Sequence, residues 1–138
     1  MQTDTLASFF QHVTSTAGVT VRVAVNFMPD QSRVEAGRWF WVYHIRIENG
    51  RDDTVQLRTR HWRITDARGV VNLVDGDGVV GETPILGPGQ SHDYVSGCEL
   101  EAEQGSMQGY YGFTTRDGTP FEVMIPFFPL SVPQPAAE

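Results

Sequence analysis

Residues 60–89 decide the fold, and they read RHWRITDARGVVNLVDGDGVVGETPILGPG. Two short apolar runs, at 62–65 and 70–74, flank the turn sequence Asp-Ala-Arg-Gly at 66–69. The prolines and glycines that crowd 84–89 exclude a helix, because proline lacks the amide donor that a helix interior needs. The stretch therefore predicts a pair of strands followed by an irregular crossing to another part of the structure.

The segments before this stretch show the alternation of half-buried strands. In residues 19–27, four valines and a phenylalanine occupy the odd positions, and mostly polar residues occupy the even ones. Apolar residues change from odd to even positions within 55–65, which predicts a bulge near 59–61. Residues 38–49 are the strongest strand of the chain, and its inward face is predicted to consist of Trp39, Trp41, Tyr43, Ile45 and Ile47.

Seven short strands separated by turn signals, with no convincing internal helix, predict an all-β fold. We expect an antiparallel β-sandwich of two sheets with an immunoglobulin-like architecture. Residues 1–17 are predicted to be a poorly ordered N-terminal arm, although their apolar residues would also fit a short helix. Residues 18–132 form the single domain, and 133–138 are a C-terminal tail with nothing to bury.

Composition excludes several classes of function. All ten basic residues of the 138-residue chain are arginines, so a phosphate-loop lysine, a Schiff base and a lysine general base are excluded. The net charge of -7 opposes binding to nucleic acid or to an anionic membrane, since both need a basic surface. Cys98 is the only cysteine, which excludes an internal disulfide and a cysteine zinc cluster. No apolar run reaches the roughly 20 residues of a membrane helix, and residues 1–4 lack a basic start, so we expect no membrane insertion and a cytoplasmic location.

One segment has the spacing of a ligand motif. The pattern Gly-x-Gly-x-x-Gly at 76–81 matches the dinucleotide fingerprint, in which glycines let backbone amides approach a pyrophosphate at the start of a helix. Binding of a nucleotide or another anion here is one interpretation. The other is a tight loop between the sheets whose glycines adopt positive φ. The candidate ligand loop consists of Gly76, Asp77, Gly78, Gly81 and Glu82.

The surroundings of this loop favour the structural interpretation. Pro84 leaves no helix whose dipole could hold phosphates, and Asp75, Asp77 and Glu82 place carboxylates beside the supposed anion site. Only Asp75 and Asp77 have a spacing that suits a divalent cation, and a calcium loop needs a third ligand and a glutamate in register. Weak contact with Mg²⁺ stays open, and we predict no metal site and no cofactor.

The sequence offers no catalytic constellation. Ser91, His92 and Asp93 have the residue types of a triad, but neighbours in a strand point to opposite faces, so His92 would face away from the other two. The four histidines lack the paired spacing of a metal site. Cys98 is predicted to be a small buried hydrophobic residue rather than a nucleophile. We therefore predict no catalytic residue.

The only locally basic patch with an aromatic residue lies in the strand at 55–65. It can be a solvated strand face, or it can be a surface for a protein partner, in which arginine and tryptophan serve as anchors. Nucleic acid is a third alternative that the overall acidity opposes. The candidate partner surface consists of Arg58, Arg60, His61, Trp62 and Arg63.

Motifs along residues 19–132 carry a resemblance to a known family. They include Met-Pro-Asp-Gln-Ser at 28–32, Arg-His-Trp at 60–62, the glycine segment continued to Thr-Pro at 83–84, and Ser-Gly-Cys at 96–98. In their order and density these motifs resemble the ApaG family. The resemblance implies a fibronectin type III-like β-sandwich. It places strands near 19–27, 38–49 and 92–96 in one sheet, and strands near 55–65, 70–74, 107–115 and 120–127 in the other.

The resemblance also implies a function. The ApaG family is associated in bacteria with resistance to, or efflux of, cobalt and magnesium, and its domain serves as an interaction module in some eukaryotic proteins. It implies no enzymatic activity. We therefore expect a non-catalytic module that binds a protein partner of unknown identity. The alternative is binding or hydrolysis of a nucleotide such as a diadenosine polyphosphate at the glycine loop. A homodimer through an exposed sheet edge is also open, without a prediction of which strand forms it.

Overall fold

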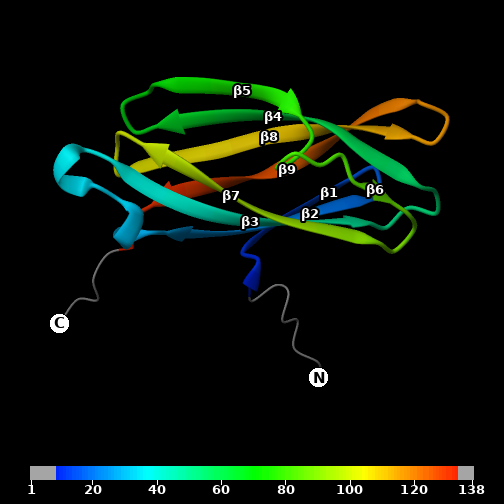
Figure 1. Ribbon diagram of the computed structural model, residues 1–138, viewed down its shortest axis with the longest axis horizontal. Coiled ribbons are helices and arrows are strands. Elements are labelled where there is room, and N and C mark those ends of the chain that lie inside the picture. The colour runs from blue at the N-terminus through cyan, green and yellow to red at the C-terminus, as the bar shows by residue number, and fades with distance from the viewer. Residues whose placement is uncertain (1–8, 134–138) are drawn as a thin grey trace.

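Two antiparallel sheets pack face to face in the computed structural model, which describes residues 9–133 (Figure 1). The four-stranded sheet has the order β1-β2-β3-β7 and consists of β1 (His12–Thr16), β2 (Val19–Phe27), β3 (Trp39–Asn49) and β7 (Ser91–Leu100). The five-stranded sheet has the order β5-β4-β8-β9, with β6 also paired to β4, and consists of β4 (Val55–Asp66), β5 (Val71–Asp77), β6 (Ile85–Leu86), β8 (Gln104–Thr115) and β9 (Pro120–Ser131). The predicted all-β sandwich is confirmed, and so is the division of the predicted strands between the sheets.

The core lies between the sheets, where the odd-numbered residues of β2 and β3 meet the inward residues of β4, β8 and β9. Its centre is an aromatic cluster in which Tyr43 lies 5.6 Å from Trp62 and 5.9 Å from Phe128, measured between ring centroids. The hydroxyl groups of Tyr94 and Tyr111 form a buried hydrogen bond of 2.5 Å across the two sheets. The period of two that the sequence shows in β2 and β3 is therefore the period of burial.

A bulge in β4 sets which residues face the core. The register between β4 and β8 shifts between Leu57 and Thr59, slightly before the predicted position at 59–61. Beyond this bulge the even-numbered residues point inward, so Trp62 is 5% exposed. His61 and Arg63 consequently point outward.

Two strands were not predicted. Residues 12–16 form β1, which pairs with β2 from His12 opposite Val23 to Thr16 opposite Val19, so the prediction of a poorly ordered arm is wrong for this part of 1–17. A two-residue turn with φ of 51° at Ala17 and 82° at Gly18 makes this hairpin. The short β6 pairs with the start of β4. Residues 1–8 of the predicted arm and 134–138 of the predicted tail lie outside the described residues.

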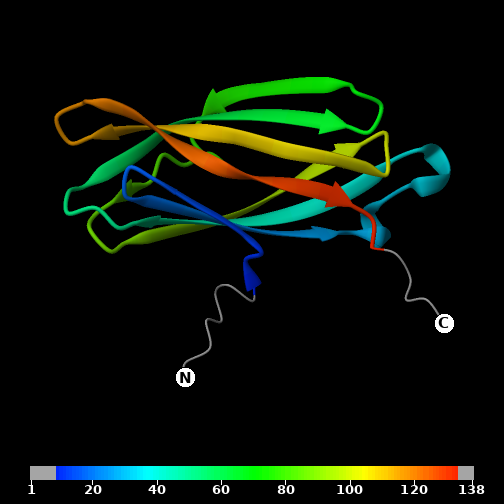
Figure 2. The same ribbon diagram turned by 180° about the vertical axis from the view of Figure 1, so that it is seen from behind.

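The two long sides of the sandwich differ. On one side β1 lies against β9, and the Met124 amide donates to the Thr16 hydroxyl at 3.2 Å. On the other side the free edges are β5 and β7, and the glycine loop that follows β5 lies between them (Figures 1 and 2). Within residues 9–133, no helix is long and apolar enough to cross a membrane.

Candidate functional site

The glycine loop is a tight turn and does not begin a helix. Val79 and Glu82 are bonded to each other twice, from the Val79 amide to the Glu82 carbonyl at 2.8 Å and back at 3.0 Å. The two residues between them have positive φ, 48° at Val80 and 78° at Gly81. Positive φ at both central residues is the mark of a two-residue type I′ turn. This geometry agrees with the interpretation of the segment as a tight loop rather than the start of a helix.

Each glycine of the motif has its own structural reason. Gly76 lies inside β5, and a Cβ there would come within 2.8 Å of the Arg60 guanidinium, so the reason is space rather than the predicted positive φ. Gly78 has φ of 63°, and a Cβ on it would overlap the Glu82 carbonyl oxygen. Gly81 needs only its positive φ, since a Cβ there would meet open space.

The polar groups of the loop are bonded within the domain. The Gly78 amide donates to the Arg58 carbonyl at 2.8 Å. The Arg60 guanidinium donates through Nη1 to the Asp77 carbonyl at 2.8 Å and to the Gly78 carbonyl at 3.0 Å. Val79 is fully buried and anchors the loop in the core. The amides of Gly78 and Val79 therefore already have partners, and the nearby arginine is bonded to carbonyls.

Carboxylates of the loop do not converge on a cation position. Asp75 accepts a hydrogen bond from His61 at 2.7 Å, whereas Glu82 lies 3.7 Å from the Nε2 atom of His92. Among the residues that the structure describes, no group of three or more His, Cys, Asp or Glu side chains could hold a metal ion.

The predicted partner surface is divided by the alternation of β4. Trp62 is buried in the aromatic cluster, so its predicted role as a surface anchor is wrong. Arg60 turns to the glycine loop. Arg58 remains exposed and donates to the Thr114 hydroxyl at 3.1 Å, and His61 and Arg63 lie on the outer face of the five-stranded sheet. The pleat of the strand places alternate residues of the patch on opposite faces, and the bulge decides that Trp62 is one of those that face inward.

The outer face of the five-stranded sheet holds an apolar groove with a volume of about 400 Å³. At one wall the His61 ring stacks on Tyr110, with centroids 4.4 Å apart and an angle of 20° between the planes. Asp75 only accepts, so the Nδ1 atom of His61 donates to it, and Nε2 forms a second hydrogen bond with the Thr59 hydroxyl at 3.0 Å. These two bonds fix the ring. The groove is lined by His61, Trp62, Arg63, Leu73, Asp75, Gln108, Gly109, Tyr110, Met124, Ile125 and Phe127.

Large exposed apolar side chains surround this groove. Leu73 of β5 is 70% exposed, Phe127 of β9 is 56% exposed, and Met124 is also exposed. The groove lies where the register between β8 and β9 shifts between Met107 and Gly109. Sequence reasoning missed all three apolar residues. For Met124 and Phe127 the signal was the run Val-Met-Ile-Pro-Phe-Phe at 123–128, in which apolar residues occupy both odd and even positions of the strand, so that some of them must face outward.

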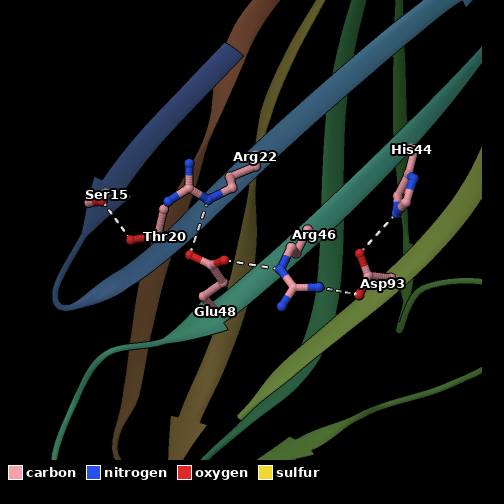
Figure 3. Close-up of polar contacts among 7 residues, drawn as sticks. All are labelled: Ser15, Thr20, Arg22, His44, Arg46, Glu48 and Asp93. Atoms are coloured by element: carbon pink, nitrogen blue, oxygen red, sulfur yellow. Dashed lines mark hydrogen bonds and ion pairs between the residues drawn. The ribbon is translucent and has the colours of Figure 1, made fainter. Parts of the chain in front are cut away.

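The outer face of the other sheet is charged, and its charges are paired (Figure 3). Arg22 and Glu48 lie 3.1 Å apart, and Glu48 also accepts from Arg46 at 3.0 Å. Asp93 then accepts from Arg46 at 2.9 Å and pairs with His44 at 2.8 Å. The row alternates in sign across β2, β3 and β7, so each charge of it has an opposite neighbour.

The triad residue types at 91–93 and the lone cysteine do not form a catalytic arrangement. His92 faces the inter-sheet space, while Ser91 and Asp93 lie on the outer side, so the predicted separation of the three residues is confirmed. Cys98 is buried, as predicted, and burial raises the pKa of its thiol to about 11. Burial likewise raises the pKa values of Tyr94 and Tyr111. These shifts keep all three groups protonated at neutral pH.

Known proteins resemble this chain over most of its length. The model of the ApaG domain matches residues 29–115. The protein ApaG of Methylobacterium sp. (strain 4-46) is 48% identical over 118 residues, which cover 86% of this chain and 91% of that protein. The protein ApaG of Rhodospirillum centenum is 49% identical over 124 residues, with coverage of 90% and 94%. A crystal structure described as the ApaA protein of Bordetella pertussis has a TM-score of 0.82 and 39% identity, and covers 85% of this chain and 95% of that one.

Proposed function

We propose that the chain, which belongs to the ApaG domain family, is a non-catalytic module. It binds a protein partner in the groove on the five-stranded sheet. The partner chemistry that fits is an extended apolar segment with an aromatic or long aliphatic side chain for the groove. A nearby carboxylate would meet Arg63, which makes no ion pair with any residue of 9–133.

One observation carries this proposal, namely the difference between the two outer faces. The charged face satisfies its own groups, whereas the opposite face exposes Leu73, Met124 and Phe127 around a groove. A concave apolar surface with a few polar groups at its rim is typical of binding sites. The fixed ring of His61 would supply a rigid wall, because its two hydrogen bonds are already made in the free protein.

Absence of catalysis is supported by the chemistry of the described residues. The groove offers one histidine, which is held between Asp75 and the Thr59 hydroxyl, and that hydroxyl is not among the groups that line the groove. The lone thiol is buried on the other side of the sheet. A general base needs a substrate proton within reach, and a nucleophile needs an activating base.

The proposal is tested by affinity purification from the cells that encode the chain, with Phe127→Ala as the test variant and Val95→Ala as the control. Phe127 and Val95 are both 56% exposed, but Val95 lies on the outer face of β7 in the opposite sheet. We expect a partner that the wild type and Val95→Ala capture and that Phe127→Ala loses. Equal capture by all three proteins would refute the groove as the binding site.

The link of this family to Co²⁺ and Mg²⁺ enters the proposal as an indirect effect of partner binding. It is supported by the lack of a metal-ligating cluster within residues 9–133. We expect a strain with Phe127→Ala to grow in CoCl₂ as a deletion strain does, and a strain with Val95→Ala to grow as the wild type does. Heat of binding on titration of the purified protein with Co²⁺ or Mg²⁺ would contradict an indirect role.

The alternative function, nucleotide binding at the glycine loop, has one observation in its favour. Val80 is a β-branched residue held at φ of 48°, and such conformations cluster at functional sites. Against it stand the bonded Gly78 amide and the bonded guanidinium of Arg60. We expect no thermal shift with ATP or a diadenosine polyphosphate, with or without Mg²⁺. A thermal shift with either nucleotide would favour the alternative.

A further inference from the structure

The free edges of the two sheets are protected to very different degrees. β9 carries three prolines, Pro120, Pro126 and Pro129, which cannot donate to a further strand, and the short β1 lies against it. β7 carries Asp93 and Glu99 on its outer face, so two copies of this edge would bring carboxylates together. Each of these edges has one of the usual features that prevent strands from pairing between molecules.

The first part of the β5 edge, residues 71–74, has no such protection, and the two carboxylates of the strand, Asp75 and Asp77, lie at its far end. Its residues up to Val74 include no proline and no charge, and its register with β4 runs without a bulge from Val71 to Asp77. Leu73, Val71 and Val74 are all exposed. In Figures 1 and 2 the strand forms the upper rim of the molecule, with no described segment beyond it. An edge with a regular register and exposed apolar side chains is a template for another strand.

The backbone of β5 shows which groups are available. The Gly78 amide donates to Arg58, and the Val70 carbonyl accepts from Asp66, so the even-numbered positions turn their polar groups toward β4. Because these groups alternate along an antiparallel strand, the amides and carbonyls of Val71, Leu73 and Asp75 point away from the sheet. Three consecutive outward positions are enough for a symmetric antiparallel ladder.

We propose that two copies of this chain pair through their β5 edges, antiparallel and about a two-fold axis, with Leu73 of one copy opposite Leu73 of the other. In this register Val71 lies opposite Asp75 of the second copy, so the two Asp75 carboxylates are kept apart. The antiparallel direction is therefore the one that keeps the carboxylates of the two strands apart.

The same arrangement buries apolar side chains on both faces of the joined sheet. Leu73 and Val71 meet their counterparts on the outer face, and Val74 meets Asn72 on the inner face. A contact made by one strand per molecule is small, so the dimer is a weak one whose population depends on concentration. It shares Leu73 with the groove but forms without a third molecule, and Phe127 of β9 belongs to the groove alone.

Sedimentation velocity of the purified full chain over a dilution series tests the proposal. We expect a monomer–dimer equilibrium for the wild type. Leu73→Lys places two like charges directly opposite each other and should weaken association by about tenfold or more. Val71→Lys places its new charge opposite Asp75 of the other copy and should leave association unchanged or strengthen it by about twofold. Val95→Lys, on the edge of the other sheet, should have no effect.

Each result decides the matter. A wild type that is monomeric at every concentration, or a Leu73→Lys variant that associates as the wild type does, overturns the proposal. Dissociation caused by Val95→Lys points to β7 and overturns it as well. Dissociation caused by Val71→Lys overturns the register. A far-ultraviolet circular dichroism melt of each variant shows that the fold is kept, which the exposure of all three positions predicts. A failure here leaves the capture experiment with Phe127→Ala standing.

Discussion

The turn of the glycine loop holds a valine, Val80, in a left-handed backbone conformation that valine rarely adopts. Val80 has φ of 48° and is 63% exposed, and it lies at the first central position of the type I′ turn. Asparagine tolerates this left-handed region much better than a β-branched residue, and Asn-Gly is the preferred pair for such turns. The substitution Val80→Asn should therefore stabilise the protein without changing its fold.

The expected gain follows from two opposing contributions. A left-handed conformation costs an ordinary L-residue roughly 1 to 2 kcal/mol, and asparagine avoids most of that cost. Val80 is partly buried, and the loss of this contact costs about 0.5 kcal/mol when scaled from the full burial of a valine. The net change in the free energy of unfolding is about +1 kcal/mol. For a domain of this size that corresponds to a rise of about 3 to 5 °C in Tm.

Urea and thermal denaturation of the wild type and of Val80→Asn measure this change, and Val95→Asn is the control. Val95 is about as exposed as Val80 but lies in an extended strand, where asparagine is unfavourable. The two substitutions should therefore have opposite signs, since only Val80 is held in the left-handed region. A Val80→Asn protein that is no more stable than the wild type would refute the strained turn.

Three further predictions concern buried or bonded groups. Either Tyr94→Phe or Tyr111→Phe should lower the free energy of unfolding by about 1 to 3 kcal/mol, because each leaves the other buried hydroxyl unpaired. The double variant should lose less than the sum of the two, and additive losses in urea titrations would contradict a direct bond. Cys98 should resist alkylation in the native protein at neutral pH, since a thiol pKa of about 11 in place of 9.0 leaves about a hundredfold less thiolate. Labelling as fast as in denaturant would show that the thiol is accessible and would contradict this. The Arg68 guanidinium holds the pKa of the Asp66 carboxyl below its usual 3.8, so the contribution of this carboxylate is complete above that pH and is lost as the pH falls through the lowered value. The stability of the wild type should therefore fall more steeply in acid than that of Asp66→Asn, and parallel acid denaturation curves would contradict this.

The fold could be predicted because one physical pattern dominates the sequence. In β3 every second residue is large and apolar, and those residues are the ones that the structure buries. The change of parity in β4 predicted a bulge, since Leu57 and Trp62 can share a face only if an extra residue separates them. β1 escaped prediction because its sequence, His-Val-Thr-Ser-Thr, is mostly polar and is held mainly by pairing with β2. Its turn uses Ala17 where asparagine or glycine would have been the signal.

The candidate site was harder to predict, because a period of two does not say which apolar residues are left uncovered. Leu73 and Phe127 look like core residues in the sequence and are exposed in the structure. Trp62 looked like a surface anchor because arginines surround it, and it is buried. Which face of a strand is covered depends on the second sheet, and local sequence carries no information about that packing.

The glycine motif shows how one spacing can arise from unrelated physical needs. A dinucleotide fingerprint needs its glycines to bring backbone amides close to a phosphate. Here Gly76 makes room for the guanidinium of Arg60, and that guanidinium holds the carbonyls of Asp77 and Gly78 in the turn. The first glycine and the arginine 16 positions earlier therefore act together in one packing arrangement. It follows that Arg60→Ala should make Gly76→Ala less harmful, whereas no such coupling is expected if the glycine serves a phosphate.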